Sequence, residues 1–173
     1  MRKLRYNVAM SLDGFIAGPN GEYDWITPDP SFDFARLFSE FDLFVMGRKT
    51  FQTLLAQGDQ NPTQGAKVIV FSRTLRQPDY PDVEVTDQAP SQVVAARKAQ
   101  AGKDIWLFGG GLLFRELLDA RLVDSVEVAL VPYLLGQGIR LLPEGRSHKL
   151  ILTSARALPT GIQLLNYTPR YDA

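Results

Sequence analysis

The alternation of strand-like and helix-like segments limits the fold of this sequence more than any other feature. Short runs rich in apolar, β-branched or aromatic residues indicate strands. These runs are residues 4–10, 43–46, 67–71, 105–108, 125–131, 149–158 and 162–168. The stretches between the early runs are typical of helices. They are residues 30–40, 49–56, 90–101 and 112–119, the first with Asp29 as its expected N-cap.

The order of these segments predicts a mixed sheet. Strands that alternate with helices favour parallel pairing, with helices on both faces of the sheet. After Ala120 the chain has almost no helix signal, which predicts antiparallel strands at one edge. No internal repeat, low-complexity tract or break in composition divides the chain. We therefore expect an α/β fold in a single domain over residues 1–173.

Composition excludes several classes of function. Lysine and arginine number 19, as do aspartate and glutamate, so the net charge is zero and no global field attracts nucleic acid or an anionic membrane. With no cysteine and a single histidine, His148, the chain cannot build a thiolate or imidazole metal cluster. No apolar run reaches the ~20 residues of a membrane span, and no signal peptide is recognisable at the N-terminus. We expect a cytoplasmic protein without metal, membrane or nucleic-acid partners.

Two glycine loops are candidates for holding phosphate groups. In open α/β sheets, ligands bind where strands end and helices begin. The loop Gly47-Arg48-Lys49-Thr50 places two cations at a helix N-terminus, where the helix dipole favours anions. The loop Gly109-Gly110-Gly111 offers backbone without Cβ atoms. For each loop the alternative is an ordinary tight turn.

Known glycine motifs narrow the choice of ligand. Neither loop has the Gly-Lys-Ser/Thr ending of a Walker loop, and Phe114 replaces the third glycine of a Rossmann fingerprint. Ser72 and Arg73 follow the strand at 67–71, so a hydroxyl and a cation stand at another strand end. Together with Arg48 and Lys49 they would surround a 2′-phosphate. This favours NADPH over NADH.

Five segments in this order resemble a known family: SLDGFIAG, VMGRKTF, VIVFSR, LFGGG and VALVPYLLGQGIRLL. The chain resembles the dihydrofolate reductase-like superfamily over nearly its whole length. It is most similar to stand-alone proteins related to the C-terminal reductase domain of the bifunctional riboflavin-biosynthesis deaminase/reductase. The resemblance implies a mixed, mainly parallel sheet of eight strands flanked by about four helices, with NADPH across the strand ends. By analogy it also implies a homodimer through the late strands.

The resemblance assigns residues to the cofactor. Those at the phosphates are Gly47, Arg48, Lys49 and Thr50, with Ser72 and Arg73 at the adenosine 2′-phosphate. Those along the pyrophosphate and nicotinamide are Gly109, Gly110, Gly111, Leu112 and Leu113. Ala9 and Ile16 align with positions whose backbone meets the nicotinamide carboxamide, and the alternatives are strand core for Ala9 and loop packing for Ile16. The segment QTLLAQGDQNPTQGAK departs from the family pattern, which has an acidic, Pro-containing stretch leading to a substrate-binding arginine.

Hydride transfer also needs a bound acceptor and a source of protons. Asp33 and Asp13 are the candidate catalytic acids, with Asp29 a weaker one. For Asp33 the alternative is a structural role, because the helix dipole favours a carboxylate in the first turn of a helix. For Asp13 the alternative is a plain Asp-Gly turn. Trp25 and Phe34 are candidates for the wall of a substrate pocket, with core packing as the alternative.

Three functions stay open at this point. The first is an NADPH-dependent reductase acting on a pterin-like or ribosylaminopyrimidinone-like heterocycle. The second is an NADPH-binding module without turnover, because no catalytic acid is unambiguous. The third is a binder of nucleotide phosphates unrelated to nicotinamide.

Overall fold

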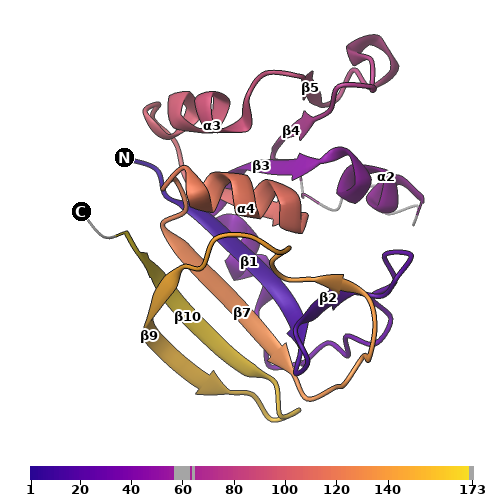
Figure 1. Cartoon of the computed structure of the whole chain (residues 1–173), viewed down its shortest axis with the longest axis vertical. Helices are drawn as coiled ribbons and strands as arrows, with labels where there is room; N and C mark the ends of the chain where they lie inside the picture. The colour runs from indigo at the N-terminus through magenta and orange to yellow at the C-terminus, as the bar shows by residue number, and fades with distance from the viewer. Residues whose placement is uncertain (57–62, 64, 172–173) are drawn as a thin grey trace.

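A central sheet of eight strands organises the computed structural model, which describes residues 1–56, 63 and 65–171. The strand order is β5-β4-β3-β6-β1-β7-β10-β9 (Figure 1). The bounds are β1 (Leu4–Ser11), β3 (Phe41–Gly47), β4 (Lys67–Phe71), β5 (Glu84–Thr86), β6 (Asp104–Gly109), β7 (Ser125–Val131), β9 (Lys149–Ala157) and β10 (Gln163–Arg170). The first six strands in this order pair in parallel, and β10 is antiparallel to both β7 and β9. The predicted mixed sheet with an antiparallel edge is confirmed.

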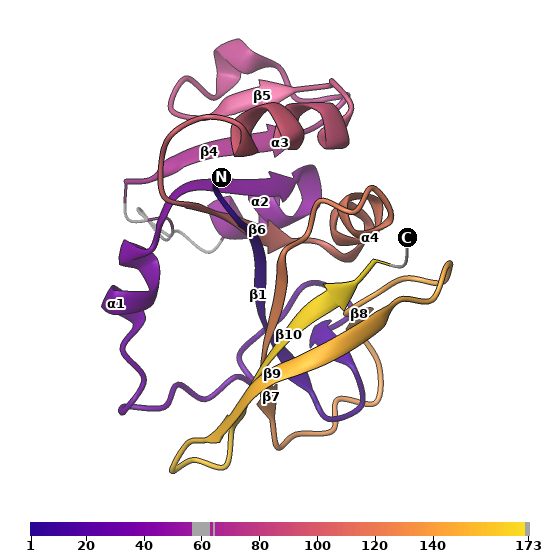
Figure 2. The ribbon, with the colours of Figure 1, turned by 90° about the vertical axis from the view of Figure 1, so that its left-hand side faces the viewer.

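Helices cover both faces of this sheet, as Figure 2 shows. They are α1 (Phe34–Ser39), α2 (Arg48–Ala56), α3 (Pro90–Lys98) and α4 (Gly111–Asp119), with a short 3-10 turn, η1 (Gln77–Asp79). Helices α3 and α4 bury Val94, Leu117 and their neighbours against one face. Helices α1 and α2 pack Phe38 and Phe51 against the aromatic cluster of the other face. The four predicted helices are confirmed.

The first helix begins later than the sequence predicts. Helix α1 starts at Phe34, and its N-cap is Asp33, whose Oδ1 accepts a hydrogen bond from the Arg36 N–H at 2.8 Å. The predicted cap at Asp29 is wrong, because Asp29 is buried and accepts hydrogen bonds from Ser31 and Thr160 instead. These bonds hold the pKa of Asp29 well below its usual range. Asp29 therefore ties the segment before α1 to the β9–β10 turn.

A second, two-stranded sheet lies beside the main one. It pairs β2 (Phe15–Ala17) with β8 (Ile139–Arg140). A side chain at Gly138 would overlap the carbonyl oxygen of Ala17, so this close approach of two backbones requires glycine. The pairing holds the segment after β1 against the segment after β7.

Tyr6 carries a hydroxyl without a partner in the main core. The residue is fully buried, its ring stacks on Phe114 at 3.9 Å between centroids, and burial raises its pKa. The hydroxyl makes no hydrogen bond to any described residue. Because a buried hydroxyl without a partner loses its hydration, we expect Tyr6→Phe to raise the free energy of unfolding by about 1 kcal/mol.

Urea unfolding of matched variants checks this expectation. Tyr171 is the control, because its hydroxyl donates a hydrogen bond to the Val123 carbonyl at 2.7 Å. Tyr171→Phe should lower stability by about 1 kcal/mol while Tyr6→Phe raises it. A loss of stability in Tyr6→Phe would mean that the hydroxyl has a partner in solution.

Candidate functional site

The carboxyl ends of three parallel strands lie side by side. Gly47 at the end of β3 is in register with Phe71 at the end of β4, and Met46 is in register with Gly109 at the end of β6. The segments that follow these strands therefore open on one edge of the sheet. Arg48, Ser72 and Gly110 begin them. The structure thus gathers the three predicted cofactor segments into one place.

Two of these segments are in contact. Cβ atoms placed on Gly109 and Gly110 would each lie 3.5 Å from Thr50 Oγ1. Gly109 has a φ of +141°, which a residue with a side chain rarely adopts, and the Gly109–Gly110 peptide is cis. Bare backbone therefore faces the start of α2. This is the arrangement that lets a phosphate chain lie against N–H groups.

Two helices begin at this edge. Helix α2 starts at Arg48 and helix α4 at Gly111, so both direct unpaired N–H groups and the positive end of the helix dipole toward it. Leu112 is exposed in the first turn of α4, whereas Leu113 is buried in the main core. Leu113 thus anchors the helix, and Leu112 stands open to a ligand.

The cations at this edge have few partners. Arg48 donates from Nη1 to Gln52 Oε1 at 3.0 Å. Within the described residues, the side chains of Lys49 and Arg73 make no hydrogen bond or ion pair, and both are exposed. Ser72 is buried, and its Oγ accepts hydrogen bonds from the N–H groups of Thr74 and Leu75. Ser72 therefore shapes the turn that carries Arg73. The charges of Lys49 and Arg73 are not neutralised by described residues.

The remaining predicted cofactor residues lie on β1 and β2. Ala9 lies on β1, in register with Ala129 of β7, and Ile16 is the middle residue of β2. Both are half-buried. Strand β1 lies between β6 and β7 in the sheet, so Ala9 belongs to the strand next to the one that ends in the glycine loop.

Asp13 joins the turn after β1 to the loop after β7. Its Oδ1 accepts hydrogen bonds from Ser11 Oγ at 2.6 Å and from the Leu135 N–H at 3.0 Å. Its Oδ2 accepts one from the Gly136 N–H at 2.7 Å. These bonds, with that from Ser11 the largest cause, lower the pKa of Asp13 to about 2. Asp13 is thus ionised at neutral pH and positions two loops.

The depressed pKa of Asp13 predicts a pH dependence. The contribution of Asp13 to stability is present above its ordinary pKa of 3.8 and is lost as the pH falls toward 2. In Asp13→Asn the amide cannot accept from all three donors, so we expect a lower Tm at neutral pH and a flatter fall in Tm below about pH 4. Thermal melts across the acid range measure both. Parallel Tm curves for the variant and the parent would contradict the assignment.

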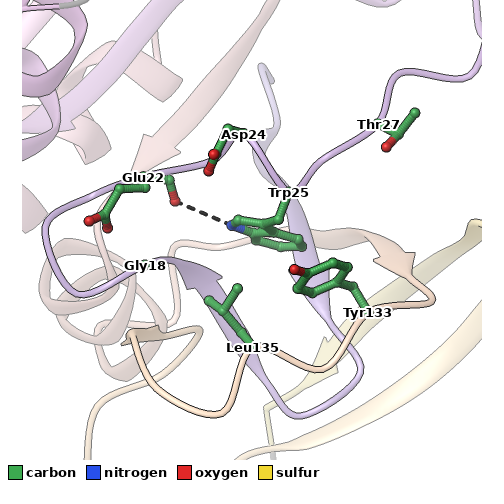
Figure 3. A pocket seen from close by; sticks show the side chains of 7 residues that line it. All are labelled: Gly18, Glu22, Asp24, Trp25, Thr27, Tyr133 and Leu135. Carbon is green, nitrogen blue, oxygen red and sulfur yellow. Dashed lines mark hydrogen bonds between the residues drawn. The ribbon is translucent and has the colours of Figure 1, made fainter.

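A cavity of about 530 Å³ lies next to this loop pair. Its lining residues are Gly18, Glu22, Asp24, Trp25, Thr27, Tyr133 and Leu135 (Figure 3). Trp25 Nε1 donates a hydrogen bond to the Glu22 carbonyl at 3.2 Å, and the rings of Trp25 and Tyr133 lie 5.9 Å apart. The cavity is within the size range of small-molecule sites.

The loop that forms this cavity also packs against helix α2. A Cβ atom placed on Gly21 would lie 3.3 Å from Thr53 Oγ1 of α2, the helix that begins at Arg48. Gly18 comes directly after β2, so it is two residues away from Ile16. The loop that lines the cavity therefore contacts α2, the helix whose first turn contains the predicted phosphate-binding residues.

The structure places the other predicted substrate and acid residues apart from this cavity lining. Asp33 is exposed and its Oδ1 caps α1. Phe34 is 48% exposed and packs edge-on against Phe32 at 4.7 Å between ring centroids. Of the predicted substrate residues, Trp25 alone is among the described lining residues. Glu22, Asp24 and Tyr133 were not among the predicted site residues. Tyr133 follows the end of β7, so knowledge of the strand order would have indicated it as a candidate.

Comparison with known proteins decides the family. The sequence profile described as the RibD C-terminal domain matches residues 2–164. The chain belongs to the RibD C-terminal domain family.

Its relatives include proteins of similar length. The chain is 30% identical to YyaP of Bacillus subtilis, with 96% of this chain and 94% of YyaP covered. A crystal structure of a putative riboflavin biosynthesis protein from Shewanella has a TM-score of 0.83 at 25% identity, covering 99% of this chain and all of that one.

A longer solved structure shares the fold. The Thermotoga maritima protein described as a diaminohydroxyphosphoribosylaminopyrimidine deaminase/5-amino-6-(5-phosphoribosylamino)uracil reductase has a TM-score of 0.72 at 19% identity. The match covers 98% of this chain and 57% of that one. In the part of the chain that the structure describes, no helix is long and apolar enough to cross a membrane, and no group of His, Cys, Asp and Glu is arranged to hold a metal ion.

Proposed function

We propose that this member of the RibD C-terminal domain family is an NADPH-dependent reductase of a flat heterocycle. The observation that carries the proposal is the contact of Thr50 with Gly109 and Gly110 at one edge of the sheet. At this edge the side chains of Lys49 and Arg73 form no hydrogen bond or ion pair with described residues. Bare backbone, two helix N-termini and uncompensated cations at one edge are the features that bind a dinucleotide. Family membership and the named reductase relative point to the same chemistry.

The residues divide the work between two adjoining parts of the site. Arg48, Lys49 and Thr50 would hold phosphates, and Arg73 would hold the 2′-phosphate. The glycines before α4 would carry the pyrophosphate, with Ala9 and Ile16 at the nicotinamide. NADPH would supply a hydride. Trp25 and Tyr133 would hold the acceptor ring in the cavity, and the loop around Gly21 would exclude water.

Asp33 and Asp13 remain predictions as catalytic acids. Asparagine is as good an N-cap as aspartate, so Asp33→Asn should keep α1 intact and isolate any chemical role. Turnover that disappears in this variant, with the Tm unchanged, would assign a chemical role to Asp33. Asp13 is a poor proton donor at neutral pH, because its lowered pKa keeps it ionised.

Ligand-induced stabilisation followed by turnover tests the proposal. A thermal-shift titration with NADPH, NADH, NADP and ATP should show the largest rise in Tm with the two 2′-phosphorylated dinucleotides. NADPH oxidation is then followed with dihydrofolate and with a ribosylaminopyrimidinone. Equal stabilisation by ATP and NADPH would favour a nucleotide-phosphate binder. Stabilisation by NADPH without turnover of any heterocycle would favour a binding module.

We also propose that a second copy of the chain covers β9. This strand lies at the end of the sheet order, and Leu150, Ile151 and Leu152 on it are 37%, 50% and 54% exposed. Exposed apolar edge strands promote association. Ile151→Lys should convert a dimer into a monomer in light scattering, whereas Lys at the similarly exposed Leu55 of α2 should not. A monomeric parent protein would refute the dimer.

A further inference from the structure

The cavity and the cofactor edge carry opposite charges. Arg48, Lys49 and Arg73 stand at the cofactor edge. The cavity has Glu22 and Asp24 in its lining, and none of its seven described lining residues is Lys, Arg or His. The two parts thus differ in the sign of their charged side chains.

Hydrogen bonds favour the charged form of the Glu22 carboxylate, and an aromatic wall lies beside the acidic residues of the cavity. The Asn20 side chain and N–H donate hydrogen bonds to the Glu22 carboxylate at 2.7 and 2.8 Å, and they lower its pKa. Figure 3 shows Glu22 and Asp24 on the side of Trp25 that carries the indole nitrogen. Tyr133 and Leu135 lie below the indole in the same view. In this view the Glu22 carbonyl faces the indole nitrogen and the Glu22 carboxylate points away from the indole. A flat ring resting on Trp25 would therefore turn an edge toward Asp24, with the charge of Glu22 further from the ring.

We propose that the cavity selects an unphosphorylated flat heterocycle that presents amino groups or a protonated ring nitrogen. Carboxylates accept strong hydrogen bonds from such donors, and an aromatic wall attracts a flat or cationic ring. A phosphate in the same cavity would meet two like charges and, among the described lining residues, no compensating cation. This selectivity differs from that implied by the phosphoribosyl substrate in the name of the Thermotoga maritima relative. The inference rests on the proposed function for the role of the ligand as hydride acceptor.

A matched pair of ligands tests the selectivity directly. The probes are a ribosylaminopyrimidinone nucleoside and its 5′-phosphate, bound with and without NADP. Quenching of Trp25 fluorescence reports binding, and it is assigned by its persistence in Trp106→Phe, because the chain has only these two tryptophans. We expect the Kd of the nucleoside to be about tenfold or more below that of the phosphate.

Charge variants then tie the preference to the cavity. Glu22→Gln with Asp24→Asn should bring the two Kd values within about threefold of each other, and Asp24→Lys should favour the phosphate. Asp79→Asn is the control, because Asp79 is an exposed acid in η1, outside the cavity lining. Tighter binding of the phosphate by the parent protein, or binding of neither probe, would overturn the inference. NADPH stabilisation is measured separately, so a failed cavity inference and a failed cofactor assignment give different results.

Discussion

Replacing Arg73 by glutamate should raise the Kd for NADPH by about 100-fold and change the Kd for NADH by less than about threefold. Arg73 follows β4, whose carboxyl end lies beside that of β3. The two dinucleotides differ only in the 2′-phosphate, so an arginine that binds this group affects one of them. Because the Arg73 side chain contacts no described residue as a hydrogen-bond or ion-pair partner, the fold should not change.

Arg76 provides a matched control for this experiment. It is an exposed arginine three residues further along the same segment, next to η1. Arg76→Glu introduces the same charge change, so it measures the general electrostatic effect on dinucleotide binding. Fluorescence titration of both cofactors against both variants gives the selectivity. Equal weakening of NADPH and NADH by Arg73→Glu would remove Arg73 from the 2′-phosphate site.

Replacing Arg5 by methionine should lower the free energy of unfolding by about 3 kcal/mol. Arg5 on β1 donates from Nε and Nη2 to the two carboxylate oxygens of Glu127 on β7, at 2.6 and 2.8 Å. The two side chains are only 16% and 11% exposed. Asn7 and Ser125 also donate to the Glu127 carboxylate. Removing the guanidinium would leave a largely buried charge without its cation.

A double variant and a pH series separate pairing from packing. Arg5→Met with Glu127→Leu should recover most of the lost stability, because apolar pairs often replace buried ion pairs without cost. Although burial opposes ionisation of Glu127, the bonds from Arg5, Ser125 and Asn7 lower its pKa below the ordinary 4.5. Its contribution is therefore present above that value and is lost as the pH falls through the lower folded-state pKa. Arg5→Met should thus lose less stability than the parent between about pH 5 and 3. A double variant as unstable as the single one would contradict the ion-pair explanation.

The long elements of the fold were predictable because their signals are local. Strand β4 contains the continuous apolar run VIVF, β7 is apolar apart from Ser125 and Glu127, and for both strands the predicted and observed bounds agree. Strands β2, β5 and β8 have only two or three residues each, too few for a periodic pattern. The role of Asp29 depends on Thr160, which is 131 residues away. By residue type Asp29 and Asp33 are equally good caps, and the contact with Thr160 gives Asp29 another role.

The site was predictable to the same extent. The two glycine loops are recognisable in the sequence, and the family resemblance assigns both of them to the cofactor. Their contact through Thr50 depends on β3 and β6 being neighbours in the sheet, which the spacing of the loops does not show. Glu22, Asp24 and Tyr133 belong to no motif. They form one cavity because β2 pairs with β8 and because Asp13 fastens the loop after β7.

No described residue that lines the cavity belongs to the predicted cofactor loops at 47–50, 72–73 and 109–113. The cavity is formed by segments that follow β2 and β7, whereas the edge is formed by those that follow β3, β4 and β6. Apart from Gly21, which lies against Thr53 of α2, substitutions in the loops at 18–27 and 133–135 can therefore accumulate without disturbing the groups that would hold the hydride donor. A lineage with this division can retain one reductant while exchanging the molecule that is reduced.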